Sequence, residues 1–369
     1  MTALGRSTPP VIDPRPLPTV DTVIVGVGAR SAGGLTALQV AMSARANKIR
    51  PLESHLIDKK GANIATVRLP SIGDSVVGLE RLLALAVPAF AQAASPWLSA
   101  QRARGQPAPG IPVIVALPSE ACPGFDPRMK QLLLAGLEAR TQIAVDHEQS
   151  RLIFAGRGGG AAAFERAVAD IRAGAEAIVV GGVDSYFDPD ALEALDRDLR
   201  LHGPDTENGF IPGEGAGFAV LASRRRAASM HRYGQVISAA VENEPHPYGS
   251  EAPCLAQGVT LAVKRATEAL GQDARRIPWV LTDVANERHR VTEWSYAFAR
   301  THLAFTPDVI HEQPLLKTGD LGAASAAVLL VMAAIRWQTR CDAGDAALIV
   351  THSDGPERGA MVISNEVAV

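Results

Sequence analysis

The chain has 369 residues, of which 47% are hydrophobic and 20% are charged, so it can bury a sizeable core. Its formal net charge of -3 gives no electrostatic footprint for a nucleic-acid partner. Three scattered cysteines suit reduced thiols in the cytoplasm, where we expect the protein to reside. The sequence begins with polar, proline-rich residues rather than an apolar leader, and its longest apolar run, residues 323–335, is too short to span a bilayer.

Residues 1–20 contain five prolines and predict an extended arm. From there on, apolar runs of strand length alternate with segments of helical periodicity. The predicted strands are 23–27, 111–117, two strands around Leu152 and Ile178, and then 218–221, 235–241, 279–284, 346–351 and 359–363. The predicted helices are 35–46, 74–94, 125–140, one near Ala161, one in an Asp-rich segment after Gly182, 257–270 and 321–337. This alternation predicts an α/β fold with a mostly parallel sheet covered on both faces.

Residues 150–182 combine a strand, a Gly-rich turn, an Ala-rich helix and a second strand that ends in Gly-Gly. A sharp turn from a strand into a helix exposes one side chain at the positive end of the helix, which is a suitable place for a nucleophile. The first helical turn offers Arg157 and three glycines, with no Cys or Ser. A guanidinium stays protonated in proteins, so Arg157 cannot attack a carbonyl.

This segment resembles the nucleophile region of beta-ketoacyl synthases, where a Thr-Ala-Cys-x-x-Gly turn leads into the helix. Residues 23–34, 208–236, 250–271 and 315–334 resemble further stretches of the same family, in the same order. The most specific of these matches is NGFIPGEGAG, which is similar to the family hairpin Asp-Gly-Phe-x-x-Gly-Glu-Gly-Ala-Gly. The resemblance implies a thiolase-like, duplicated five-layer α/β/α/β/α sandwich with mixed, mostly parallel sheets. It also implies an N-terminal half over residues 21–222 and a C-terminal half over residues 223–369, in one compact unit.

The catalytic positions of the family differ in this chain. Counting back from the end of the helix places Arg157 at the position of the Cys, and counting back from the following Gly-Gly places Gly156 there. The first catalytic His of the family corresponds to Asn286, and the second corresponds to Asp320. The late Gly-Phe-Gly-Gly loop, which gates acyl entry in the family, reads HSDGPERGA over residues 352–360. Condensation needs a thiolate and two imidazoles, so the resemblance implies that this chain has no residues for that reaction.

Five positions are expected to shape the pocket or hold the structure together: Gly158, Gly160, Glu214, Lys317 and Gly319. We expect Glu214 and Lys317 to form a buried pair. An arginine at the start of a helix is repelled by the helix dipole and needs an anion. We therefore expect Arg157 and Asp320 to form an ion pair in the former active site, with Glu287 nearby; a bound carboxylate or phosphate is the alternative anion.

Other signals do not indicate a cofactor or a metal. Residues 26–33 are a near miss to a dinucleotide fingerprint, with the wrong glycine spacing. Cys122 follows a strand, but Pro123 prevents a helix from starting at its sulfur, so a displaced nucleophile is disfavoured. His289 and Glu293 are expected on the surface of a helix start. The nine histidines show no metal-ligand spacing, so no metal site is expected.

Three functional interpretations follow. The first is a structural or regulatory subunit similar to a chain-length factor, in a homodimer or in a heterodimer with an active beta-ketoacyl synthase. The second is an acyltransferase on the same scaffold that works with acyl carrier protein or coenzyme A through a non-standard site. The third is a protein that binds an acyl or small acidic ligand without any reaction. The loss of the Gly-Phe-Gly-Gly gate favours the first interpretation.

Overall fold

The computed structural model describes residues 18–105, 110–203, 206–271 and 276–365; of the predicted arm over residues 1–20, residues 1–17 lie outside this part. The described strands are β1 (Thr22–Ser31), β2 (Leu52–Ile57), β3 (Asn63–Thr66), β4 (Val113–Leu117), β5 (Arg151–Phe154), β6 (Ala177–Ser185), β7 (Glu214–Ser223), β8 (Gly234–Asn243), β9 (Ile277–Thr282), β10 (Phe305–Glu312), β11 (Ala346–His352) and β12 (Glu357–Ser364). The described helices are α1 (Ala37–Arg45), α2 (Gly78–Ala103), α3 (Met129–Thr141), α4 (Gly156–Arg172), α5 (Pro189–Arg197), α6 (Gln257–Glu268), α7 (Arg288–Thr301), α8 (Leu315–Thr318) and α9 (Ser325–Gln338).

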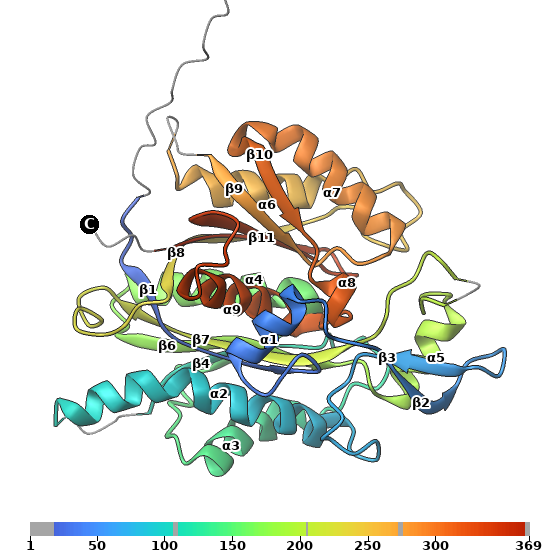
Figure 1. Cartoon of the computed structure of the whole chain (residues 1–369), viewed down its shortest axis with the longest axis horizontal. Helices are drawn as coiled ribbons and strands as arrows, with labels where there is room; N and C mark the ends of the chain where they lie inside the picture. The colour runs from blue at the N-terminus through green and yellow to red at the C-terminus, as the bar shows by residue number, and fades with distance from the viewer. Residues whose placement is uncertain (1–17, 106–109, 204–205, 272–275, 366–369) are drawn as a thin grey trace, which may run out of the picture.

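Ten of these strands form one hydrogen-bonded array in the order β10-β9-β11-β12-β8-β1-β7-β6-β4-β5. The array is narrow at its middle, because β1 and β8 pair only through Val23 with Gln235 and Ile24 with Gly234. On either side of this junction lies a sheet of five strands, and the two sheets face each other across a layer of helices (Figure 1). The division of the chain into halves at residue 222 remains a prediction.

The helices complete a five-layer arrangement, as expected. Helices α2 and α3 cover the outer face of the sheet that contains β1, β4, β6 and β7, and α6 and α7 cover the outer face of the other sheet (Figure 1). Helices α1, α4 and α9 lie between the two sheets. The α/β/α/β/α sandwich predicted from the resemblance is therefore confirmed.

The sheets are mixed, and they are less parallel than the alternation of strands and helices suggested. Strand β4 runs parallel to β5 and β6, and β9 runs parallel to β10 and β11. The remaining pairs in the array, including β1–β7, β6–β7 and β12–β8, are antiparallel. One reason is that β11 returns directly as β12 through a short loop, without the crossover helix that a parallel neighbour requires.

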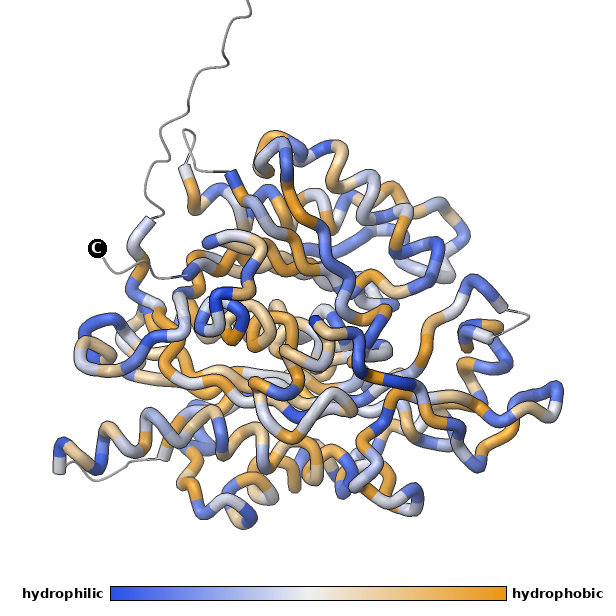
Figure 2. Tube along the Cα trace, viewed as in Figure 1, coloured by the Kyte–Doolittle hydropathy of each residue, from blue (hydrophilic) through white to orange (hydrophobic). Residues whose placement is uncertain are grey.

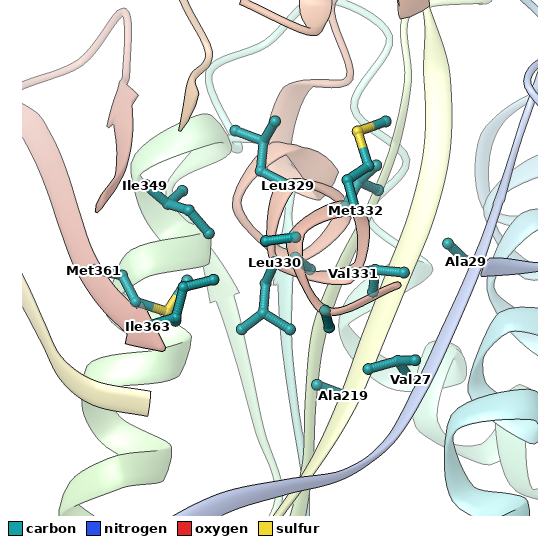
Figure 3. Packing of buried hydrophobic residues seen from close by; sticks show 14 of the residues in the cluster. Val27, Ala29, Ala219, Leu329, Leu330, Val331, Met332, Ile349, Met361 and Ile363 are labelled. Carbon is teal, nitrogen blue, oxygen red and sulfur yellow. The ribbon is translucent and has the colours of Figure 1, made fainter. Parts of the chain in front are cut away.

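Helix α9 is the centre of the molecule, because its residues from Ser325 to Trp337 are all buried. A helix that is apolar all round belongs in a core rather than at a surface. Leu329, Leu330, Val331 and Met332 lie between strands of the two sheets, with Val27, Ala29 and Ala219 on one side and Ile349, Met361 and Ile363 on the other (Figure 3). The hydropathy of the chain follows this arrangement, since apolar segments gather in the inner layers (Figure 2).

Helix α2 is longer than the predicted segment 74–94, and by length and composition alone it could cross a membrane. It packs instead on β1 and β7, and half of its most apolar window is buried inside the protein. Gly26 and Gly28 of β1 allow this contact, because a Cβ on either would lie about 2 Å from a backbone oxygen of α2. The apolar composition of α2 is thus accounted for by packing in the core.

Candidate functional site

The turn between β5 and α4 forms an elbow. Gly156, the first residue of α4, has φ of +55°, in the left-handed region that favours glycine. Arg157 follows with a side chain that is 3% exposed, and Gly158, Gly159 and Gly160 are also buried. The predicted turn is present, and in its first helical turn the functional side chain is the guanidinium of Arg157.

Arg157 belongs to a closed ring of six charged side chains, in which every arginine lies between two acids. Its Nε donates to both carboxylate oxygens of Asp320 at 3.0 and 3.1 Å, and its Nη1 donates to Asp354 at 3.1 Å. Arg290 donates to Asp320 at 2.8 Å and also to Glu287. The expected ion pair between Arg157 and Asp320 is therefore present.

Arg200 closes the ring on its other side. It donates to the two oxygens of Glu287 at 2.7 and 3.0 Å, and to Asp354 at 2.8 and 3.0 Å. Three guanidinium groups and three carboxylates make the ring neutral, and each acid bridges two arginines. We call these six residues the charge ring: Arg157, Arg200, Glu287, Arg290, Asp320 and Asp354.

Phe210 lies against all three arginines of the charge ring. The guanidinium carbons of Arg157, Arg200 and Arg290 are 5.5, 5.4 and 5.3 Å from the centre of its ring. The face of an aromatic ring attracts cations at this range, most strongly where water is excluded. Phe210 is 1% exposed, so it contributes to holding the three guanidinium groups together.

Burial and neighbouring charges set the protonation of the acids. Burial alone would raise the pKa of Asp320, but Arg157 and Arg290 lower it to about 2. In the same way burial opposes ionisation of Glu287, and Arg290 and Arg200 outweigh it, so the pKa of Glu287 is lowered. Both side chains are thus anionic at neutral pH, and their oxygens accept hydrogen bonds from arginines. Neither is therefore suited to accept a proton in catalysis.

A cavity of about 490 Å³ opens onto this ring. Its walls carry apolar side chains from several elements, including Leu82, Phe125, Met129, Phe187 and Leu195. Arg157, Arg200 and Asp354 of the charge ring also line it, together with Asp184 and Tyr186. Among the described residues that line it there is no histidine.

Asp184 and Cys122 are among the ionisable groups in the cavity wall whose pKa values are perturbed. Burial raises the pKa of Asp184 to about 7, although its oxygens accept hydrogen bonds from the backbone of Ser185 and Ala323. Desolvation raises the pKa of Cys122 to about 11, so its sulfur is a thiol rather than a thiolate at neutral pH. Cys122 therefore reaches the cavity but lacks the ionisation that a nucleophile needs.

Asn286 lies outside the charge ring, and the expected surface position of His289 is wrong. Asn286 is exposed and bonds to the segment that contains His202 and Glu207, so it does not join Arg157 and Asp320; the neighbouring Glu287 points inward instead. His289 is half-buried and stacks on Tyr248 with 4.3 Å between ring centroids, and burial lowers its pKa to about 4.

The expected pairing of Glu214 with Lys317 is also wrong. Glu214 is buried and pairs with Arg81 of α2 at 2.5 and 2.9 Å, whereas Lys317 is exposed. Arg81 is well suited to this pairing, because a guanidinium can donate to both carboxylate oxygens at once. Glu293, expected at the surface, is 3% exposed and paired with Arg358.

The glycines at the predicted pocket positions lie at close contacts. A Cβ on Gly158 would lie 2.6 Å from that of Glu357, and a Cβ on Gly160 would lie 2.6 Å from that of Ala326. Gly319 has φ of +70°, and a Cβ there would meet Val67 at 2.9 Å. These positions admit no larger side chain without a shift of the neighbouring elements.

The family model for the beta-ketoacyl synthase N-terminal domain matches residues 158–227. No curated protein sequence matches the chain. The structure is similar to a type II polyketide synthase acyl-carrier protein in complex with its ketosynthase, AntDE:AntF, with a TM-score of 0.74 and 14% identity over 94% of this chain and 99% of that chain. The chain has a beta-ketoacyl synthase-like fold.

Two further structures support this likeness of fold. The ishigamide ketosynthase/chain length factor gives a TM-score of 0.73 at 15% identity, over 94% of this chain and 99% of that chain. An oxazolomycin ketosynthase domain from Streptomyces albus JA3453 gives 0.74 at 14% identity, over 95% of this chain and 75% of that chain. The beta-ketoacyl synthase-like fold thus extends well beyond the residues that the family model matches.

Sequence reasoning about this beta-ketoacyl synthase-like chain missed half of the charge ring, namely Arg200, Arg290 and Asp354. Arg200 lies beyond the end of α5, in a segment interpreted only as an Asp-rich insertion. Arg290 and Asp354 lie in the two segments that replace family motifs, where the sequence offered no pattern to follow. A buried arginine at a helix start implied that an anion was needed, but it could not indicate that three arginines share three acids.

Proposed function

We propose that this beta-ketoacyl synthase-like protein has no condensing activity and acts as a structural or regulatory subunit, in a dimer that serves fatty-acid or polyketide-type metabolism. The charge ring, three of whose members line the cavity, carries this proposal. The elbow offers Gly156 and Arg157, and the sequence resemblance assigns Asn286 and Asp320 to the positions of the two histidines. None of these side chains is a thiolate or an imidazole.

The chemistry of the charge ring supports a structural role. Condensation needs a nucleophile to accept the acyl group and donors to stabilise the developing negative charge. The guanidinium groups could be such donors, but each already lies between two carboxylates. Removing one partner from such a buried network costs several kcal/mol, about 3–5, so the ring is better suited to holding segments together than to changing charge during a reaction.

The proposed partners follow from the likeness of fold and from the position of β5. The structures named above are a ketosynthase in complex with acyl-carrier protein and a ketosynthase/chain length factor. In this chain β5 is at one edge of the ten-stranded array, so one side of its backbone is open to pairing with another chain. Its residues Leu152, Ile153 and Phe154 are half-buried rather than exposed. We propose an active beta-ketoacyl synthase or a second copy as the partner, and cytoplasm as the location.

The test is direct measurement of acyl transfer. Purified chain is incubated with malonyl and medium-chain acyl thioesters of coenzyme A and of acyl carrier protein, and its intact mass and the products are measured. We expect no acyl adduct and no condensed product, in wild type and in Cys122→Ser alike. An adduct that disappears in Cys122→Ser, or a condensation product, would contradict the proposal and identify a working nucleophile in the cavity.

The open cavity favours a second candidate function, in which the protein binds or transfers an acyl ligand through a non-standard site. Its lining combines apolar side chains with a few charged and polar ones, which suits an apolar chain with a hydrogen-bonding head. Protection of Cys122 from alkylation by a medium-chain acyl thioester would support binding, since Cys122 lines the cavity. Equal alkylation rates with and without the thioester would leave the subunit role as the better account.

A further inference from the structure

A second cluster of ionisable side chains lies outside the cavity, where β8, α6, α7 and β12 meet. Glu244 directly follows β8, Cys254 lies in the loop before α6, and Glu293 lies within α7. One ligand atom from each, the Cys sulfur and two carboxylate oxygens, lies within 4.8 Å of the others. None of the three belongs to the charge ring, so the site is independent of the proposed function.

Only one of the two carboxylate oxygens of Glu244 has a hydrogen-bond partner among the described residues. It is 1% exposed, and its Oε2 accepts a hydrogen bond of 2.7 Å from the backbone nitrogen of Gly258 in the first turn of α6. Its other oxygen, Oε1, is buried and has no hydrogen-bond partner within the described part of the chain. No cation there forms an ion pair with Glu244 either. A buried carboxylate oxygen without a partner is costly, which points to a ligand that the protein atoms do not supply.

Glu293 is held in place by an arginine. Arg358 of β12 donates to one of its oxygens at 2.5 Å, and the same guanidinium donates to backbone oxygens of Ser353 and Gly355 at 2.9 and 2.7 Å. A carboxylate fixed by hydrogen bonds from outside is typical of metal ligands, whose orientation depends on such supporting contacts. No described residue donates a hydrogen bond to the second oxygen of Glu293, which leaves that oxygen for a cation.

We propose that Glu244, Cys254 and Glu293 bind a zinc ion. The donor set favours Zn²⁺, which binds both thiolate and carboxylate, over Ca²⁺ and Mg²⁺, which take oxygen ligands. The charges suit a divalent cation, because two carboxylates, one thiolate, one Zn²⁺ and the guanidinium of Arg358 sum to zero. Zinc bonds to sulfur and oxygen are about 2.0–2.3 Å long, so short movements of the three side chains bring the ligands together.

Three protein ligands leave a fourth position open in tetrahedral coordination. Cys254 is half-buried, so the cluster is not sealed from solvent, and water can supply the fourth ligand. The thiol releases its proton when the metal binds, and the proton passes to solvent. Binding would connect the loop before α6 to α7 and, through Arg358, to β12, which gives the metal a structural role.

The experiment uses the full chain after treatment with a chelator. Zinc binding is measured by calorimetry, and Co²⁺ is then added as a spectroscopic substitute, because a cysteine ligand gives a thiolate-to-cobalt charge-transfer band in the near ultraviolet. We expect one zinc per chain and this band in wild type. Cys254→Ala and Glu244→Gln are expected to weaken zinc binding by at least about tenfold, and Cys254→Ala to abolish the band. The matched controls Cys122→Ala and Cys341→Ala are expected to bind as wild type does.

Wild type that binds no zinc at one equivalent, or that gives no charge-transfer band with Co²⁺, overturns the proposal without reference to any variant. Zinc binding that survives in both Cys254→Ala and Glu244→Gln also overturns it. Circular dichroism of each variant shows whether it is folded. If a variant does not fold, the spectrum of wild type with Co²⁺ decides.

Discussion

Arg157 lies at an electrostatically unfavourable place, the positive end of α4, and the residues around it compensate. Its charge is balanced by Asp320 and Asp354, which lie on other elements and come from the C-terminal part of the chain. At this scale the charge ring is best described as a network in which each side chain depends on two others. Replacing any one member therefore affects more than one ion pair.

Asp320→Asn tests this dependence. The change removes the negative charge shared by Arg157 and Arg290 but keeps the size of the side chain. Because two buried guanidinium groups then lose a counter-ion, we expect the free energy of unfolding to fall by about 3–5 kcal/mol, measured by urea denaturation. Asp170→Asn on the outer face of α4 removes an exposed pair with Arg166 and is expected to cost only about 0.3–0.5 kcal/mol. An equal loss of free energy of unfolding in the two variants would contradict the interdependence of the ion pairs in the charge ring.

Asp184 gives a prediction about pH. Its pKa is about 7 in the folded protein, above the usual value for an Asp, so between pH 4 and pH 7 the folded state holds a proton that the unfolded state has released. Folding is thereby disfavoured as pH rises through this range, and the stability that the protonated group contributes at low pH is lost by about pH 7. The Asp184→Asn variant lacks this titration. Relative to that of wild type, its free energy of unfolding should therefore rise by about 4 kcal/mol between pH 4 and pH 8. Parallel pH curves for the two proteins would show that Asp184 titrates normally.

At the scale of elements, the glycines at the start of α4 determine how closely α4 approaches its neighbours. A Cβ on Gly160 would lie 2.6 Å from the Cβ of Ala326 in α9, whereas a Cβ on Gly159 would have no contact shorter than 3.4 Å. The two residues are adjacent on one helix and both are buried. They therefore form a matched pair for a test of packing.

Gly160→Ala is expected to lower the free energy of unfolding by about 1–3 kcal/mol, because two backbone-fixed Cβ atoms cannot overlap and α4 must move away from α9. Gly159→Ala is expected to leave stability unchanged or to raise it by up to about 1 kcal/mol, since alanine favours the helix. Thermal and urea denaturation of the two variants would check this. A loss of stability in Gly159→Ala as large as that in Gly160→Ala would mean that helix packing is not the cause.

Sequence reasoning succeeded for elements whose signal is local and failed for those whose signal is not. The fully apolar helix α9 and the strand–turn–helix around Gly156 were predicted because hydrophobic run length and glycine clusters indicate them directly. The β2–β3 hairpin and β10 were missed, and of α7 only a helix start around His289 was expected, without its extent. Strand β10 is an edge strand with a largely exposed pattern, and α7 has a polar outer face, so neither has the continuous apolar run of a core element. The pairing of Glu214 with Arg81 could not be predicted from local sequence patterns, because the two residues are 133 positions apart.

The whole molecule has two edges in its described ten-stranded array, β5 and β10, and this matters for assembly. An edge strand presents unpaired backbone groups, and two copies of β5 related by a two-fold axis could pair so that the sheet continues from one chain into the other. Residues on both faces of β5 pack inward, Leu152 and Phe154 toward α2 and α3, and Ile153 toward the central layer. The open side of β5 is therefore its backbone edge, and a partner would be recognised mainly by main-chain hydrogen bonds.

We expect assembly through the β5 edge to be visible in mass and in hydrogen exchange. In a homodimer, sedimentation gives twice the chain mass of 38.8 kDa, and outward-facing amides of β5 exchange slowly at high concentration and faster on dilution. The amides of β10 serve as the internal control, because the other edge should exchange at the same rate at both concentrations. If the chain pairs instead with an active beta-ketoacyl synthase, it sediments as a single chain alone, and protection of β5 appears only when the synthase is added. A single-chain mass under both conditions, with β5 amides as fast as those of β10, would contradict a subunit role, because a chain that forms no complex can act only through its own cavity.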